Sequence, residues 1–352
     1  MKRQILIYLL ILLSVCSLGA QQKEKKLIDY PAKIRTWLTT YKVPAVGIGI
    51  IDEGKLRQIM VFGDLKKNDP APFNTIFQVA SLTKPVTAIL TLKLVSMGQW
   101  QLDEPLGNYW IDPDVANDPR HLKLTTRHVL THQTGFDNWR WLSKSHKLTF
   151  NFDPGTNYHY SGEGFEYLRR ALEQKFKMPM EHLADSLLFR PLNMNDTRFV
   201  WDDELYSSRF AAPHDTSRNI IQNSLNISMN KQTNAADLLK TTVEDYCKFC
   251  IAVMNKSVLT ENIFNEMVRP QVERPKYSYG LGWCILKNLS NGEYAIIHTG
   301  SDEGIQTIVI LLPISGRGIV VFTNGIKGYE VYMKVIKESL DLGEEIVKRF
   351  FK

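Results

Sequence analysis

The stretch Ser81-Leu82-Thr83-Lys84, followed directly by the apolar run 85–97, is the most informative part of this 352-residue chain. Residues three apart share one face of a helix, so we expect the Ser81 hydroxyl and the Lys84 amine to meet. A serine hydroxyl is a weak nucleophile at neutral pH, and a neighbouring amine can take its proton. The tetrad therefore predicts a serine nucleophile with a lysine partner. The alternative is a helix cap followed by a solvated lysine.

Strand patterns lie near both ends of the chain, and helical patterns fill its middle. Strands are expected at 45–51, 56–62, 282–286, 294–298, 306–312 and 318–323. Helices are expected from Ser81, and at 126–130, 162–176, 237–254 and 329–351. This order predicts an α+β fold, in which an antiparallel sheet built from both chain ends is flanked by helices and carries an inserted, mostly helical domain. The expected sheet domain comprises 27–98 and 240–352, and the helical domain comprises 99–239, with a ligand cleft between them.

Residues 1–20 have the pattern of a secretory signal peptide. Lys2 and Arg3 precede the apolar run 5–13, which is too short to span a bilayer stably, and small or polar residues follow up to Ala20. We expect cleavage after Ala20 and a secreted or periplasmic protein, whose net charge falls from +6 to +4. The alternative is a lipoprotein anchored to the membrane through Cys16. The small net charge, without a dense basic block, argues against nucleic-acid binding.

Three cysteines remain after that cleavage, an odd number that argues against a disulfide framework. Cys247 and Cys250 form C-x-x-C, a spacing used in redox and zinc sites, but no second pair completes a zinc site. Their apolar helical surroundings predict core packing. His128 and His132 have the spacing of helical zinc ligands, but no glutamate follows His128, so we interpret His132 as structural. We expect no metal and no cofactor.

Further motifs follow the tetrad along the chain. They are FQVASLTK at 77–84, LTHQTG at 130–135, PG at 154–155 with YS at 160–161, PLNMNDT at 191–197, YGLGW at 279–283, HTG at 298–300 and VFTN at 321–324. From about residue 44 to residue 324, the chain thus resembles the serine β-lactamase and penicillin-binding protein family, specifically its class C branch, which also contains esterases and D-amino-acid peptidases. The resemblance implies a β-lactamase/transpeptidase-like fold and an acyl-enzyme mechanism.

The resemblance also implies catalytic roles for three side chains. Ser81 would attack a carbonyl and form the acyl-enzyme, and Lys84 would hold or accept its proton. Tyr160 would pass a proton to the leaving group and then help to activate the hydrolytic water. Whether Lys84 or Tyr160 is the principal base stays open. The alternative for Tyr160 is a core aromatic residue.

The implied substrate-binding residues lie in the HTG segment and directly after it. They are His298, Thr299, Gly300 and Ser301. The backbone amides of Ser81 and Ser301 would hold the oxyanion, and Gly300 would leave room for the substrate. The alternative for His298 is simple packing at a strand end. Trp139 and Trp141 line the cleft mouth or pack in a loop.

Two positions depart from the family pattern. Gly162 replaces an asparagine that contacts the substrate and the lysine, and His298 replaces a lysine that attracts a substrate carboxylate. Neutral imidazole anchors an anion more weakly than ammonium. Both changes weaken the case for β-lactam hydrolysis and leave the acyl-transfer residues in place. The sequence therefore predicts a secreted serine hydrolase acting on an ester, an amide or a D-amino-acid peptide. The alternative is a non-catalytic binder or sensor of peptidoglycan fragments on the same scaffold.

Overall fold

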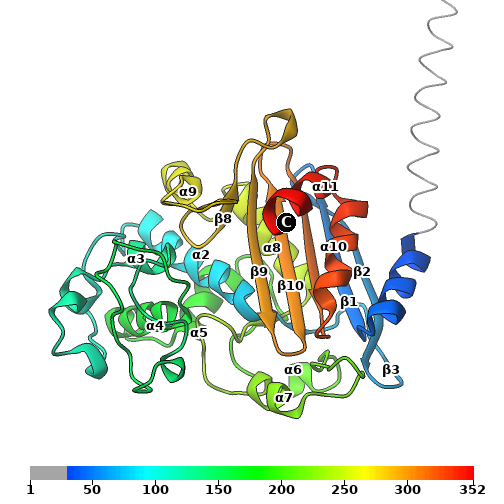
Figure 1. Ribbon diagram of the computed structural model, residues 1–352, viewed down its shortest axis with the longest axis horizontal. Coiled ribbons are helices and arrows are strands. Elements are labelled where there is room, and N and C mark those ends of the chain that lie inside the picture. Colours follow the sequence, from blue (N-terminus) through cyan, green and yellow to red (C-terminus); the bar gives the residue numbers. More distant parts are fainter. Residues whose placement is uncertain (1–29) are drawn as a thin grey trace, which may run out of the picture.

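The computed structural model describes residues 30–352, and a nine-stranded antiparallel sheet lies at their centre (Figure 1). Its strand order is β3-β2-β1-β11-β10-β9-β8-β7-β6. The strands are β1 (Ala45–Asp52), β2 (Lys55–Lys66), β3 (Asp69–Pro70), β6 (Val272–Glu273), β7 (Ser278–Tyr279), β8 (Cys284–Leu286), β9 (Ala295–Asp302), β10 (Ile305–Leu312) and β11 (Arg317–Thr323). The pairing of β1 with β11 joins the two ends of the chain. This confirms the predicted α+β fold with a sheet built from both ends.

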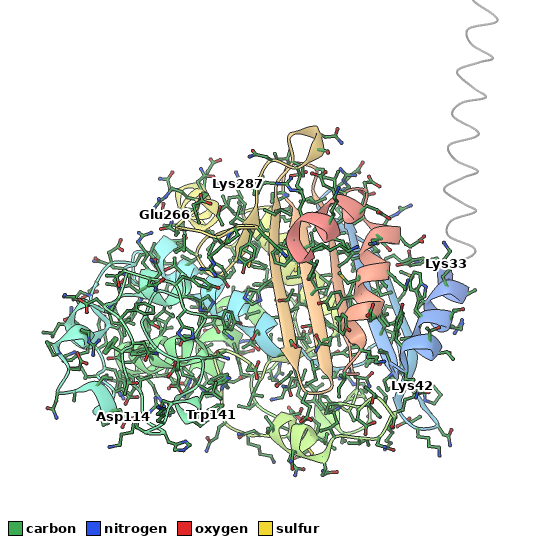
Figure 2. All side chains as sticks on the ribbon, viewed as in Figure 1. Lys33, Lys42, Asp114, Trp141, Glu266 and Lys287 are labelled. Carbon is green, nitrogen blue, oxygen red and sulfur yellow. The ribbon has the colours of Figure 1, made fainter. Side chains whose placement is uncertain are left out.

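Helices cover both faces of this sheet. Further helices lie in the segment of the chain that separates the N-terminal strands from the C-terminal strands. In chain order, the helices of both groups are 30–41, α2 (Thr83–Ser96), α3 (Thr126–Leu130), α4 (Gly162–Phe176), α5 (Met180–Ala184), α6 (Asp203–Tyr206), α7 (Gln222–Ser228), α8 (Val243–Met254), α9 (Glu261–Val268), α10 (Gly328–Ser339) and α11 (Gly343–Ile346). Segment 99–239 contributes no strand to the nine-stranded sheet. The domain boundaries proposed from the sequence stay predictions. In Figure 2, Asp114 and Trp141 lie at the opposite end of the molecule from Lys33 and Lys42.

The period of two along β11 sorts its side chains into two cores. Val320 and Phe322 pack in the core that contains α2 and α8, whereas Ile319 and Val321 pack in the core that contains α10 and helix 30–41. Because both faces of this strand are buried, its sequence is a nearly continuous apolar run. The sheet is therefore the middle of three layers.

Glycines on β1 allow α8 to lie directly on the sheet. A Cβ atom at Gly49 would lie only 2.3 Å from the sulfur of Cys247. Cys247 and Cys250 are both free, fully buried thiols in this helix. Their surroundings are those of core residues, as the apolar pattern predicts.

Two predicted helices differ from the structure. The helix expected at 237–254 begins at Val243, because Lys240–Thr241 forms strand β5, which pairs with β4 (Phe77–Gln78), and Thr242 then caps the helix. The helix expected at 329–351 is interrupted after α10. A Cβ at Gly343 would lie 2.1 Å from the Ile336 carbonyl oxygen, so this glycine lets α11 start against the end of α10.

The predicted signal peptide at 1–20 and the alternative lipid site at Cys16 lie outside the described residues. Within residues 30–352, the structure contains no helix with the length and apolar character needed to cross a lipid bilayer.

Candidate active site

Ser81 lies in a strained turn at the start of α2. The turn is a short 3₁₀ helix, Ala80–Leu82, in which Ala80 has a φ of 47°. A residue with a Cβ rarely adopts this left-handed conformation, so the neighbouring structure must impose it. Two threonine hydroxyls do so, because Thr83 donates to the Ala80 carbonyl at 2.7 Å and Thr307 donates to the Val79 carbonyl at 2.8 Å. The turn leaves Ser81 half-buried.

Lys84 lies one helical turn further along, and its amine reaches the serine. Its Nζ atom donates to Ser81 Oγ at 3.0 Å and to the Ala236 carbonyl oxygen at 3.0 Å. The side chain is only 1% exposed. The structure thus brings together the two residues that the S-x-x-K spacing pairs.

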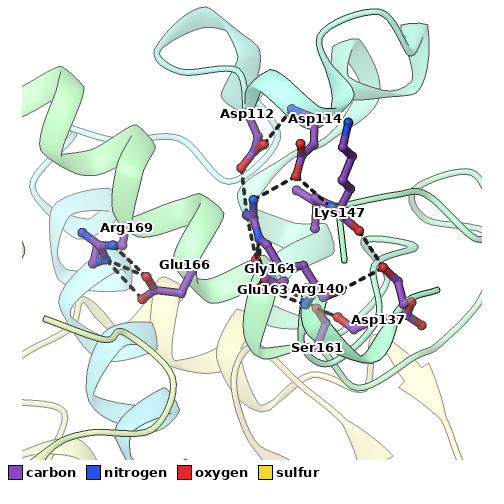
Figure 3. A network of polar contacts seen from close by, with 12 residues as sticks. Asp112, Asp114, Asp137, Arg140, Lys147, Ser161, Glu163, Gly164, Glu166 and Arg169 are labelled. Atoms are coloured by element: carbon purple, nitrogen blue, oxygen red, sulfur yellow. Dashed lines mark hydrogen bonds and ion pairs between the residues drawn. The ribbon is translucent and has the colours of Figure 1, made fainter. Parts of the chain in front are cut away.

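The segment that holds the Lys84 amine is itself fixed from two sides. Thr87, on the same helix as Lys84, donates its hydroxyl hydrogen to the Ala235 carbonyl at 2.7 Å. Glu166 on α4 accepts a hydrogen bond from the Ala235 amide at 2.6 Å. Arg169 in turn pairs with Glu166 at 2.7 Å (Figure 3). Ala236 is therefore a rigid acceptor that orients Lys84 toward Ser81.

Tyr160 contacts this pair through its aromatic ring and not through its hydroxyl group. The Lys84 amine lies 4.7 Å from the centre of the Tyr160 ring, a cation–π distance. The other neighbour of the ring is the His132 imidazole, at 4.2 Å between ring centres. Among residues 30–352, no hydrogen bond joins the Tyr160 hydroxyl to Ser81 or Lys84. The structure thus brings the Tyr160 ring to the Lys84 amine, without a direct hydrogen bond from the Tyr160 hydroxyl to the serine oxygen in the described part of the chain.

Strand β9 forms the wall of the site on the sheet side. A Cβ at Gly300 would lie 2.2 Å from Thr307 Oγ1 and 2.3 Å from the Val79 carbonyl oxygen. Glycine is therefore required here so that β9 can pass against the serine turn. The next residue, Ser301, is exposed, and its hydroxyl accepts a hydrogen bond from Gln306 at 2.9 Å. Thr299 is half-buried.

His298 is buried in the interior of the protein. The ring is 3% exposed. Its Nε2 atom lies 3.3 Å from the Tyr279 hydroxyl, and its Nδ1 atom lies 2.9 Å from the Thr299 carbonyl oxygen. Both ring nitrogens are thus occupied inside the protein, which does not fit direct contact with a substrate carboxylate. The position chosen from the HTG motif belongs to the wall behind the site.

A chain of hydrogen bonds links His298 to His132 through Tyr279. The Ser161 amide donates to His132 Nδ1 at 3.1 Å, so the ring proton of His132 must be on Nε2. That Nε2–H donates to the Tyr279 hydroxyl at 3.1 Å, which leaves the tyrosine hydrogen for His298 Nε2. His298 then donates from Nδ1 to Thr299. Every donor in this chain has an acceptor only if both imidazoles are neutral.

Burial and the nearby Lys84 cation favour the same neutral state. Burial, followed by the charge of Lys84, lowers the pKa of His298 to about 3. The same two causes, in the same order, lower the pKa of His132 well below its ordinary value. The described part of this wall thus adds no second positive charge beside Lys84 at neutral pH. The sequence indicated His132 only as a structural residue and did not single out Tyr279, although both lie within the quoted motifs.

The other wall of the site, formed by loop 137–142 and the start of α4, is held by charged groups. Arg140 pairs with Asp112 at 2.8 Å, with Glu163 at 2.9 Å and with Asp114 at 3.1 Å (Figure 3). Glu163 belongs to the first turn of α4, two residues after Ser161. Asn138 accepts hydrogen bonds from the amides of Gly162 and Glu163 at 3.0 Å. These contacts fasten loop 137–142 to the start of α4.

Comparison with known proteins gives the family of this chain. A model of the family described as Beta-lactamase matches residues 21–335. The chain belongs to this family. Among curated relatives, it is similar to esterase EstB of Burkholderia gladioli, with 26% identity over 186 residues, which cover 45% of this chain and 46% of the esterase. It is also similar to protein flp of Staphylococcus aureus, with 21% identity over 80% of this chain and 60% of that protein. The chain thus spans about half to three fifths of these relatives.

Solved structures of other proteins share the fold. The D-alanine carboxypeptidase AmpC of Burkholderia cenocepacia superposes with a TM-score of 0.74 at 18% identity, over 89% of this chain and 99% of that one. The octameric penicillin-binding protein homologue from Pyrococcus abyssi gives a TM-score of 0.74 at 20% identity, over 88% and 77% of the two chains. At these identities, the similarity shows the fold alone.

Proposed function

We propose that this Beta-lactamase family protein is a serine hydrolase that forms an acyl-enzyme at Ser81 and acts on an ester, an amide or a D-amino-acid peptide. The observation that carries the proposal is the 3.0 Å contact between Lys84 Nζ and Ser81 Oγ in a strained turn at the start of a helix. A nucleophile held within hydrogen-bond reach of its base is the arrangement that acyl transfer requires.

In the proposed reaction, the neutral form of the Lys84 amine accepts the Ser81 proton while the serine oxygen attacks the substrate carbonyl carbon. The backbone amides of Ser81 and Ser301 hold the resulting oxyanion. The tetrahedral species then collapses, the bond to the leaving group breaks, and Tyr160 or Lys84 supplies the proton that the leaving group takes. Water then gives a proton to Lys84 or Tyr160 as its oxygen attacks the acyl carbonyl carbon, the bond from that carbon to Ser81 Oγ breaks, the acid product leaves, and Ser81 Oγ takes the proton back.

Two features favour ester substrates over β-lactams. Both ring nitrogens of His298 are occupied internally, and Gly162 has no side chain to hydrogen-bond a substrate. A relative of this chain is named as an esterase. The proposal therefore ranks short esters first and β-lactams last.

The test is a panel of chromogenic esters, a cephalosporin and D-alanyl peptides, run with the wild type and with Ser81→Ala. We expect ester hydrolysis in the wild type that is lost in the variant. The absence of turnover in a folded wild type would contradict the proposal. Ligand binding without turnover that survives Ser81→Ala would instead support a non-catalytic binder of peptidoglycan fragments.

We also propose export through residues 1–20, which rests on the sequence pattern alone. Sequencing the N-terminus of the protein from a producing cell tests it. A chain that starts at Gln21 supports export, and a lipid-modified Cys16 at the N-terminus supports the lipoprotein alternative. A chain in the cytoplasm that retains Met1 contradicts both.

A further inference from the structure

Gly162 faces an indole at the point where a side chain would otherwise project. A Cβ added there would lie 2.7 Å from Trp139 Cη2, 2.8 Å from Cζ2 and 2.9 Å from Cζ3. Three adjacent ring carbons at nearly equal distances place Gly162 over the face of the six-membered ring. A larger residue at position 162 would therefore have to displace Trp139.

The indole is held firmly in that position. The preceding residue, Asn138, accepts a hydrogen bond from the Gly162 amide through its own side chain at 2.8 Å. The guanidinium of the following residue, Arg140, pairs with the Asp112 and Glu163 carboxylates. Trp141 stacks on Trp139 with 4.8 Å between ring centres and 8° between planes, and it is 57% exposed. Such an arrangement pre-orders the indoles before any ligand arrives.

Gly162, which contacts the Trp139 indole, lies close to Tyr160 along the chain. Gly162 is the first residue of α4 and comes two residues after Tyr160, whose ring adjoins the Lys84 amine. The indole thus occupies the space on the Tyr160 side of the site that a polar side chain at position 162 would fill. An indole offers a large apolar surface and one N–H donor, whereas an amide side chain offers two donors and an acceptor.

We propose that Trp139, seated on Gly162, forms an apolar subsite beside Tyr160 that selects esters or amides carrying an aryl group next to the scissile bond. This inference rests on the proposed hydrolase function. An aryl group gains contact with the indole, whereas a polar amide placed there gives up hydrogen bonds to water without replacement. The aryl group belongs either to the acyl part or to the leaving group of the substrate.

Four substrates separate these sources and the polar case. Ethyl phenylacetate carries the ring on the acyl side, benzyl acetate carries it on the leaving-group side, ethyl acetate carries none, and N-acetylglycine ethyl ester carries an amide. Hydrolysis is measured as the release of acid, and this measurement requires no chromophore. We expect wild type to prefer at least one aryl ester over ethyl acetate by about tenfold or more in kcat/KM, and to show no such preference for the amide ester.

The deciding readout is the ratio of kcat/KM for the preferred aryl ester to that for ethyl acetate. Trp139→Ala should lower this ratio about tenfold, and Trp139→Phe should restore most of it. Leu142→Ala is the matched control, because it removes a 65% exposed apolar side chain from the same loop, and it should change the ratio less than about threefold. Gly162→Asn should lose activity, and the double variant Trp139→Ala/Gly162→Asn should recover turnover of the amide ester.

An unchanged ratio in a folded Trp139→Ala protein that still hydrolyses all four esters would overturn the subsite and leave the hydrolase function standing. Failure of wild type to hydrolyse any ester would overturn both. If Gly162→Asn does not fold, the Trp139→Ala and Trp139→Phe ratios decide the matter alone.

Discussion

The two walls of the site are held together by different physical means. On the sheet side, His132, Tyr279 and His298 form a buried chain of neutral hydrogen bonds. On the helical side, Arg140 gathers three carboxylates in a network that is about one-third exposed at the guanidinium. The difference teaches that the His132–Tyr279–His298 chain is held by hydrogen bonds between neutral groups, whereas ion pairs fasten loop 137–142 to the start of α4.

Removing the Lys84 amine should have the largest effect, because this amine lies within hydrogen-bond reach of Ser81 Oγ. Lys84→Met should lower kcat/KM for esters by about 10³-fold while the fold is kept. Lys93→Met is the control, since Lys93 lies on the same helix and its amine donates to the Leu187 carbonyl instead. Steady-state kinetics with circular dichroism checks both variants. Activity of Lys84→Met within tenfold of wild type would remove the lysine from the mechanism.

Breaking the charged wall should cost stability. Arg140→Ala leaves Asp112 and Glu163 close together, with side chains only 5% exposed. We expect a loss of about 3 kcal/mol in the free energy of unfolding, measured by urea titration. Lys123→Ala breaks the exposed ion pair with Asp153, and it should cost less than about 0.5 kcal/mol. Equal losses in the two variants would mean that the Arg140 network is an ordinary surface feature.

Breaking the neutral wall should cost slightly less. Tyr279→Phe keeps the ring but leaves Nε2 of both histidines without a partner, so we expect a loss of about 2 kcal/mol. Tyr206→Phe is the matched control, because the Tyr206 hydroxyl is buried without a hydrogen-bond partner in the described residues, and its removal should be nearly neutral. A neutral Tyr279→Phe change would disprove the hydrogen-bond chain.

The neutral wall should also be the more acid-sensitive one. The folded pKa of His298 is about 3, below its unfolded value, so the unfolded chain binds an extra proton as pH falls below about 6.5. Stability from this group is therefore present above that pH and is lost as pH falls toward 3. Between pH 6 and pH 5, wild type should lose about 1 kcal/mol more than His298→Gln in urea unfolding. Parallel pH profiles would show that the pKa of His298 is the same in the folded and the unfolded chain.

Local sequence signals predicted much of the fold and part of the site. The β1–β2 hairpin, the bounds of α4 and the Ser81–Lys84 pair follow from patterns within a few residues, where one short-range contact decides the structure. The break after α10 was missed, because it depends on how closely Gly343 packs against Ile336.

The contacts between distant segments could not be predicted in this way. The bond between His132 and Tyr279 spans 147 residues, and each residue alone looks like ordinary core. The motifs placed His298 near the site but not the direction of its ring. Likewise, the sequence shows only that Gly162 has no side chain. The structure is needed to show that Trp139 occupies the space which a side chain at position 162 would fill.

Covalent labelling of Ser81 tests the central claim most directly. Intact mass spectrometry after treatment with a fluorophosphonate should show one adduct per wild-type chain, peptide mapping should place it on Ser81, and folded Ser81→Ala should show none. A folded wild-type protein that takes up no label, or that carries the label elsewhere and equally in Ser81→Ala, would contradict the acyl-enzyme account.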